Sequence, residues 1–136
     1  MKQRRQFIKT SLLVAGGIAL SAPALAKGKK SASFPGLIYS EKDQGIWDGK
    51  AGSHAPVVTV EGNKVTLFTK HGMSEKHYIV RHTLVSEKGE VLGFKTFYPT
   101  DQKAQSTYTL PDNFKGKLYA TSFCNKHDFW VTQFEI

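Results

Sequence analysis

Short runs of β-branched and aromatic residues, separated by turn sequences, constrain the fold of this 136-residue chain more than any other feature. Residues 57–60 and 64–68 flank the turn sequence Glu61-Gly62-Asn63 and predict a hairpin. Further runs of the same kind cover 77–85, 91–98, 106–110, 118–123 and 130–134. No long segment has the 3.6-residue apolar period of an amphipathic helix. The sequence therefore predicts an all-β sandwich of about seven strands in a single domain.

Composition supports one folded domain and excludes several kinds of site. The chain is 40% hydrophobic and 12% aromatic, which is too apolar for a disordered protein. Its length excludes a multidomain enzyme. The single cysteine, Cys124, excludes an internal disulfide, a four-cysteine zinc site and an iron–sulfur cluster built by this chain alone.

The first 26 residues have the pattern of an export signal. A basic start with the pair Arg4-Arg5 precedes a moderately apolar stretch at 11–22, and Ala24-Leu25-Ala26 supplies the small residues of a cleavage site. The paired arginines, with Phe7 and Lys9 behind them, resemble a twin-arginine signal. The stretch is too short and too rich in glycine and alanine for a stable membrane anchor. We therefore expect cleavage of residues 1–26, a periplasmic location, a flexible basic lead at 27–35 and a folded domain at 36–136.

Half of the formal charge belongs to this signal. The whole chain carries +8, and residues 1–26 contain four basic residues and no acidic one, so the remainder carries +4. That remainder has no arginine-rich helix and no interleaving of basic and aromatic residues. Nucleic-acid binding is therefore not expected.

Four histidines and the cysteine lie where predicted strands meet loops. His54 precedes the first strand, His71 and His77 bracket a loop, and Cys124 and His127 form a Cys-x-x-His step. Imidazoles with one thiolate favour iron, copper or zinc over calcium or magnesium. Five donors exceed the four of a structural zinc site and leave one octahedral position open. The set therefore favours an iron centre that binds a small molecule.

The fifth histidine is expected to have a different role. His82 lies inside the run 77–85, where strict alternation places it on one face with Tyr78, Val80 and Leu84. We expect a packed or edge histidine there and not a ligand.

Three segments now carry a resemblance to a known family. They are 54–58 (His-Ala-Pro-Val-Val), 71–79 (His-Gly-Met-Ser-Glu-Lys-His-Tyr-Ile) and 123–130 (Phe-Cys-Asn-Lys-His-Asp-Phe-Trp). In order and spacing, residues 45–130 resemble the iron domain of the superoxide reductases, the neelaredoxin and desulfoferrodoxin family. The resemblance implies an immunoglobulin-like β-sandwich that reduces superoxide to hydrogen peroxide.

The resemblance also implies a cofactor, its ligands and a partner. One iron per chain, cycling between Fe²⁺ and Fe³⁺, would have an axial sulfur and four equatorial nitrogens, supplied by Cys124 and by His54, His71, His77 and His127. Asn125 and nearby backbone amides would hydrogen-bond the sulfur. The four-cysteine module of some relatives is absent, so the implied enzyme depends on an external electron donor protein. Whether the chain forms a homo-oligomer is left open.

One departure from the family pattern concerns the charge beside the metal. The family usually has a Glu-Lys pair before the first histidine, whereas this chain has Gly52-Ser53. Lys50 and Lys76 are the candidate substitutes for the missing lysine.

Two other functions stay open at this point. An iron-binding sensor or electron-transfer protein could have the same fold and site without fast reductase activity. A cupredoxin-like copper protein also combines a β-sandwich with cysteine and histidine on a late loop, but it normally has a methionine a few residues after that histidine, and none follows His127.

Overall fold

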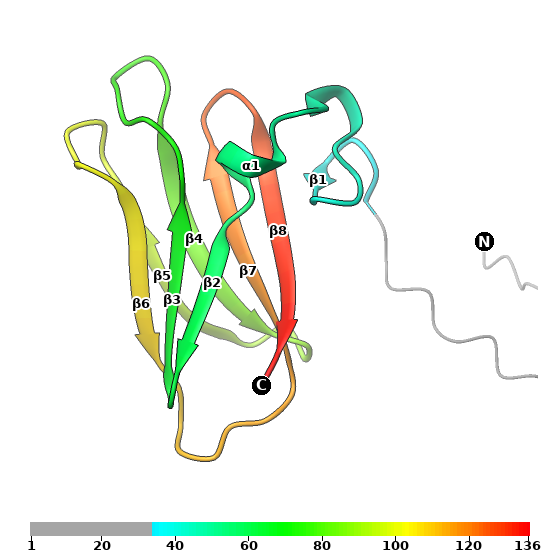
Figure 1. Ribbon diagram of the computed structural model, residues 1–136, viewed down its shortest axis with the longest axis vertical. Coiled ribbons are helices and arrows are strands. Elements are labelled where there is room, and N and C mark those ends of the chain that lie inside the picture. The colour runs from blue at the N-terminus through cyan, green and yellow to red at the C-terminus, as the bar shows by residue number, and fades with distance from the viewer. Residues whose placement is uncertain (1–33) are drawn as a thin grey trace, which may run out of the picture. The chain divides into compact units, whose positions relative to one another are not determined.

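The computed structural model describes residues 34–136, which form two β-sheets packed into a sandwich (Figure 1). One sheet has five strands in the order β1-β8-β7-β4-β5, and the other has three in the order β2-β3-β6. The strands are β1 (Ile38–Tyr39), β2 (Val57–Glu61), β3 (Lys64–Thr69), β4 (Ile79–Ser86), β5 (Val91–Thr96), β6 (Ala104–Thr109), β7 (Lys117–Cys124) and β8 (Asp128–Glu135). A 3₁₀ turn, η1 (Gly45–Trp47), and a one-turn helix, α1 (Ala51–His54), precede β2. The predicted all-β sandwich is confirmed, with eight strands.

The N-terminal segment is outside this description. The expected signal at 1–26 and all but the last two residues of the expected lead at 27–35 lie outside the described residues. Within residues 34–136, no helix is long and apolar enough to cross a membrane.

The predicted hairpin forms as expected. β2 and β3 pair antiparallel from Val57 opposite Phe68 to Glu61 opposite Lys64. The turn between them needs a positive φ, and Gly62 adopts +61°. Glycine reaches this conformation without the steric penalty of a Cβ, which explains why the turn falls there.

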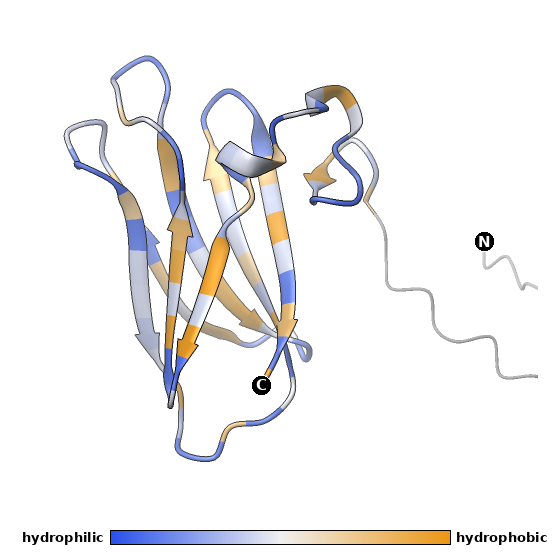
Figure 2. Cartoon of the chain, viewed as in Figure 1, coloured by the Kyte–Doolittle hydropathy of each residue, from blue (hydrophilic) through white to orange (hydrophobic). Residues whose placement is uncertain are grey.

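Alternation along the strands builds the core. On β3, Val65, Leu67 and Thr69 are buried while the residues between them are not. Figure 2 shows the hydrophobic residues of the strands as orange bands between paler or blue ones. Val65 and Leu67 pack with Leu84 and Leu118 from the opposite sheet. Burying one such side chain contributes about 1.5–3 kcal/mol, so this layer is the main source of cohesion between the sheets.

A β-bulge in β4 changes which residues face inward. Ile79 pairs with Cys124 and Arg81 with Phe123, so Val80 is an extra residue on its strand. The inward positions are therefore Ile79 and then His82, a step of three. The expectation that Val80 shares the face of His82 is wrong, because strict alternation fails at a bulge. His82 itself is fully buried, so it is a packed histidine as predicted.

Candidate metal centre

Three parts of the chain meet at one end of the sandwich. Figure 1 shows α1, the loop between β3 and β4 and the turn between β7 and β8 at this end. His54 is the last residue of α1, His71 and His77 lie in the β3–β4 loop, Cys124 ends β7, and His127 lies in the following turn. The structure thus brings together all five residues that the sequence singled out.

The donor atoms of four of these residues converge. His54 Nε2 lies 2.9 Å from His127 Nδ1, and His77 Nε2 lies 3.0 Å from the same nitrogen. Cys124 Sγ lies 3.7 Å from it. The four ligand atoms all lie within 4.8 Å of one another. They form a cluster that could hold a metal ion.

His71 comes close to this cluster but is not one of the four. Its Nε2 is 3.1 Å from His77 Nε2 and 4.0 Å from Cys124 Sγ. It stands at the open side of the loop, next to Gly72. Its role as a fifth ligand therefore stays a prediction.

A metal ion fits the contacts better than hydrogen bonds do. His127 Nδ1 has two imidazole nitrogens and one sulfur around it, but a ring nitrogen carries either one proton or one lone pair. Protons alone cannot satisfy all three contacts. Two nitrogens at the usual 2.0–2.1 Å from an ion and at right angles to each other are about 2.9 Å apart. The separations of 2.9, 3.0 and 3.1 Å match that value.

Backbone carbonyls orient two of the imidazoles. His54 Nδ1 lies 3.1 Å from the carbonyl oxygen of Lys50, four residues earlier, and 2.8 Å from Ser53 Oγ. His71 Nδ1 contacts the carbonyl oxygen of Gly72. A proton held on Nδ1 leaves Nε2 as the free lone pair that a metal requires. In His54 and His71, Nε2 is therefore the nitrogen that keeps a lone pair.

The imidazoles are held in the neutral form that binds metal. Burial lowers the pKa of His54 to about 4, with the neighbouring imidazoles adding to the effect. Burial also lowers the pKa of His71, His77 and His127. For His127 the charge of Lys50 is the next largest cause. Neutral imidazoles at neutral pH are ready to accept a cation without first losing a proton.

Cys124 lies beneath the imidazoles, and its side chain is 1% exposed. It packs with Ile79, Phe97 and Ala104 in a small apolar cluster. The backbone N–H of Lys126 points at its sulfur from 3.5 Å, as expected for a nearby amide.

Asn125 does not hydrogen-bond the sulfur, contrary to the expectation. Its Oδ1 accepts from the backbone N–H of Tyr78, and its Nδ2 donates to the carbonyl of Lys76. Its side chain therefore ties the β7–β8 turn to the loop that carries His77. This brace acts on the ligand loop and not on the sulfur.

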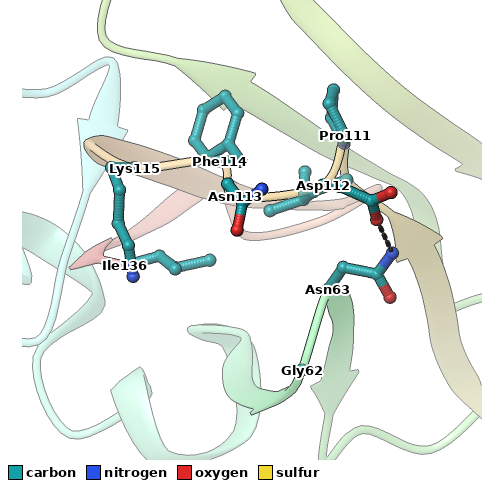
Figure 3. Close-up of a pocket in the computed structure, with 9 residues that line it drawn as sticks. Gly62, Asn63, Pro111, Asp112, Asn113, Phe114, Lys115 and Ile136 are labelled. Atoms are coloured by element: carbon teal, nitrogen blue, oxygen red, sulfur yellow. Dashed lines mark hydrogen bonds between the residues drawn. The ribbon is translucent and has the colours of Figure 1, made fainter.

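A shallow hollow opens above the imidazoles. Lys50, Ser53 and Lys70 border it together with His54, His71, His77 and His127. Lys76 and Cys124 do not line it. A second hollow lies at the opposite end of the sandwich, between the β2–β3 turn and the loop before β7, where Asn63 donates to Asp112 (Figure 3). It contains none of the candidate ligands.

Sequence reasoning missed one aromatic neighbour of the site. The half-buried Trp47, in η1, places its ring edge-on to His127 with the ring centroids 4.6 Å apart. Its Nε1 donates to Asp128 Oδ2 over 2.9 Å. The sequence signal that could have pointed to it is a tryptophan in the mostly polar stretch 44–50. Its edge-on contact restricts the orientation of the His127 imidazole.

The fold and the cluster define a metal-binding β-sandwich with histidine and cysteine donors at one end. A desulfoferrodoxin family model matches residues 46–133. The chain therefore belongs to the desulfoferrodoxin family. This membership argues against the cupredoxin-like alternative.

Solved structures agree with this assignment. A variant of the superoxide reductase (neelaredoxin) from Ignicoccus hospitalis is 28% identical, with 78% of this chain and 98% of that one aligned at a TM-score of 0.66. The one-iron superoxide reductase from Giardia intestinalis is 26% identical, and the alignment covers 62% of this chain and 98% of that one at a TM-score of 0.55. The superoxide reductase from Treponema pallidum is 27% identical, and the alignment covers 62% of this chain and 69% of that one at a TM-score of 0.50. A comparison with curated protein sequences gave no significant match.

Proposed function

We propose that the protein is an iron-dependent superoxide reductase whose ligands are His54, His71, His77, His127 and Cys124. The observation that carries the proposal is the convergence of four of these donors within 4.8 Å in a chain of the desulfoferrodoxin family. Imidazoles with a single thiolate suit iron. When bound, iron(II) supplies the electron that, with two protons, converts superoxide to hydrogen peroxide. An external protein donor then restores the electron.

The chain's own residues supply binding and access. The neutral imidazoles, which border the hollow, and the buried cysteine, which packs in the apolar cluster, would hold the cation between them. A sulfur kept out of solvent is protected from oxidation, because oxidation of a thiolate requires access. The hollow gives a small anion a direct path to the imidazole face.

Of the two candidate lysines, the structure favours Lys50. Lys50 borders the hollow, and its charge contributes to the lowered pKa of both His77 and His127, after the larger effect of burial. Lys76 does not line the hollow. We therefore assign to Lys50 the attraction of the anionic substrate.

The reductase proposal is tested by generating a pulse of superoxide over the reduced, iron-loaded protein. We expect rapid oxidation of the iron, with a rate proportional to protein concentration and one hydrogen peroxide formed per iron. Absorbance after the pulse and a peroxide assay measure both. Slow oxidation without peroxide would instead indicate an iron-binding sensor or electron-transfer protein of the same fold.

Export is the second part of the proposal. The paired arginines and the Ala24-Leu25-Ala26 sequence support transport by the twin-arginine route and a periplasmic mature chain. N-terminal sequencing of the protein from a periplasmic fraction is expected to read from Lys27. The matched control is Arg4→Lys with Arg5→Lys, which keeps the charge and should hold the protein in the cytoplasm. Recovery of the uncleaved chain from the cytoplasm in both cases would contradict the route.

A further inference from the structure

A buried polar network joins the two sheets just below the metal centre. Thr69 Oγ1 lies 2.9 Å from His82 Nε2 and 2.9 Å from Ser122 Oγ, and His82 Nδ1 lies 2.9 Å from Ser106 Oγ. Thr69, His82 and Ser122 are 0% exposed and Ser106 is 4% exposed. Thr69 and Ser106 belong to the three-stranded sheet, whereas His82 and Ser122 belong to the five-stranded one. All three contacts therefore cross between the sheets.

Once the Thr69 hydroxyl is the donor to Ser122, the positions of the other protons in the network follow. The Thr69 hydroxyl donates to Ser122 Oγ, so Thr69 Oγ1 accepts from His82 Nε2–H. His82 Nδ1 then carries the lone pair and accepts from the Ser106 hydroxyl. Burial, with a smaller contribution from Lys95, lowers the pKa of His82 to about 4, which keeps this neutral tautomer at physiological pH. Both ring nitrogens are thus satisfied.

The network sits where the ligand-bearing segments leave the sandwich. Thr69 ends β3, and its carbonyl accepts from the backbone N–H of His71 over 2.8 Å. Ser122 precedes Cys124 by two residues on β7, so both point to the same buried face. The ring of Phe97, which packs with Cys124, lies edge-on to the ring of His82 at 4.8 Å.

Cohesion alone does not require polar groups here. The neighbouring layer of the same core joins the sheets through buried valine, leucine and alanine side chains, with partly buried apolar and aromatic residues packed against them. Apolar pairs tolerate small sliding movements, whereas directional hydrogen bonds fix one register, and a fully satisfied buried network makes the surrounding structure rigid. Because both ring nitrogens of His82 are hydrogen-bonded to residues of the three-stranded sheet, the imidazole fixes the distance between the two sheets at this point of the core.

We propose that His82 is a positioning residue for the metal centre. Through Thr69 and Ser122 it fixes the strand ends that carry His71 and Cys124, and so sets their separation. The inference rests on the metal site of the proposed function, but not on the reaction that the site performs.

The test uses cobalt(II) as the probe, because its absorption reports the geometry of the donors independently of any reductase activity. His82→Leu is expected to shift the cobalt absorption bands and to weaken cobalt binding about tenfold, the lower end of what loss of an outer partner costs a metal site. His82→Gln, which can still donate to Thr69, is expected to recover part of the wild-type spectrum. Thr69→Val tests the same connection from the other sheet and should shift the bands in the same way.

Leu84→Ala is the matched control. Leu84 lies on the same strand, is equally buried, and packs in the apolar layer away from the ligands. It is expected to lower the melting temperature at least as much as His82→Leu, but to keep the wild-type cobalt spectrum. Unchanged spectra and affinities in His82→Leu and Thr69→Val would show that the network serves packing only, and would overturn the proposal. A wild-type protein that binds no cobalt and no iron would instead overturn the metal site itself.

Discussion

Replacing Cys124 with serine is expected to remove the visible colour of the oxidised, iron-loaded protein. A thiolate bound to ferric iron gives a charge-transfer band in the visible range, and a serine oxygen does not. Cys124 supplies the only sulfur within the converging donor set. Iron binding should weaken at least a hundredfold, because loss of a direct ligand costs more than loss of an outer partner. Visible spectra and iron content after loading measure the two effects.

The accompanying change in stability separates lost ligation from lost folding. Cys124 is packed among Ile79, Phe97 and Ala104, so serine would bury a hydroxyl in an apolar cluster at a cost of about 1–3 kcal/mol. Cys124→Ala removes the sulfur without adding a polar group, and it should be equally colourless. Metal-free samples of both variants are expected to keep the β-sheet circular dichroism of the wild type. A coloured Cys124→Ala protein would disprove sulfur ligation.

Replacing Lys50 with glutamine is expected to slow superoxide capture roughly tenfold at low ionic strength. A positive charge beside a hollow raises the local concentration of a small anion and hence the encounter rate. Glutamine removes the charge while keeping a polar side chain that is only one atom shorter, and the backbone carbonyl that orients His54 is unchanged. Iron content and the visible spectrum should therefore match the wild type. The rate of iron oxidation after a superoxide pulse is the measurement.

Two matched variants identify the position of the charge as the cause. Lys117→Gln makes the same change in net charge at the start of β7, at the other end of that strand from Cys124. Lys76→Gln makes it beside His77, outside the lining of the hollow. Both should slow capture much less than Lys50→Gln. The difference should shrink as salt is added, because salt screens exposed charges. Equal slowing by the Lys50, Lys76 and Lys117 variants would refute a specific role for Lys50.

In the opposite direction, Ser53→Lys adds a positive charge at the border of the hollow and should speed capture of superoxide.

The fold was largely predictable because its strands have strong local signals. The hairpin of β2 and β3 combines alternating apolar residues with a glycine turn, and the structure reproduces it. The sandwich follows because the central strands β3, β4 and β7 each bury one face. The two-residue β1 was missed, since its parallel pairing of Ile38 with Phe129 depends on a contact that no local pattern shows.

The candidate site was predictable in its residues but not in its atoms. The spacing of His71, His77 and the Cys-x-x-His step indicated the donors. That Nδ1 of His127 and Nε2 of His54 are the nitrogens that face each other depends on where the backbone places each ring. The Lys50 carbonyl lies close enough to orient His54 only because residues 51–54 form a helical turn. A single turn of four residues has no sequence pattern strong enough to predict it.

The bulge at Val80 divides β4 into two parts with different inward–outward alternation. Before it, the chain places Ile79 against Cys124 at the metal end, and after it His82 and Leu84 face the core. A bulge is a point at which a difference of one residue can be absorbed without moving the rest of the strand. The register of Ile79 opposite Cys124 is therefore set separately from the alternation that places His82 and Leu84 in the core. The metal end and the core end of β4 therefore keep separate registers, and the polar network around His82 is what connects them.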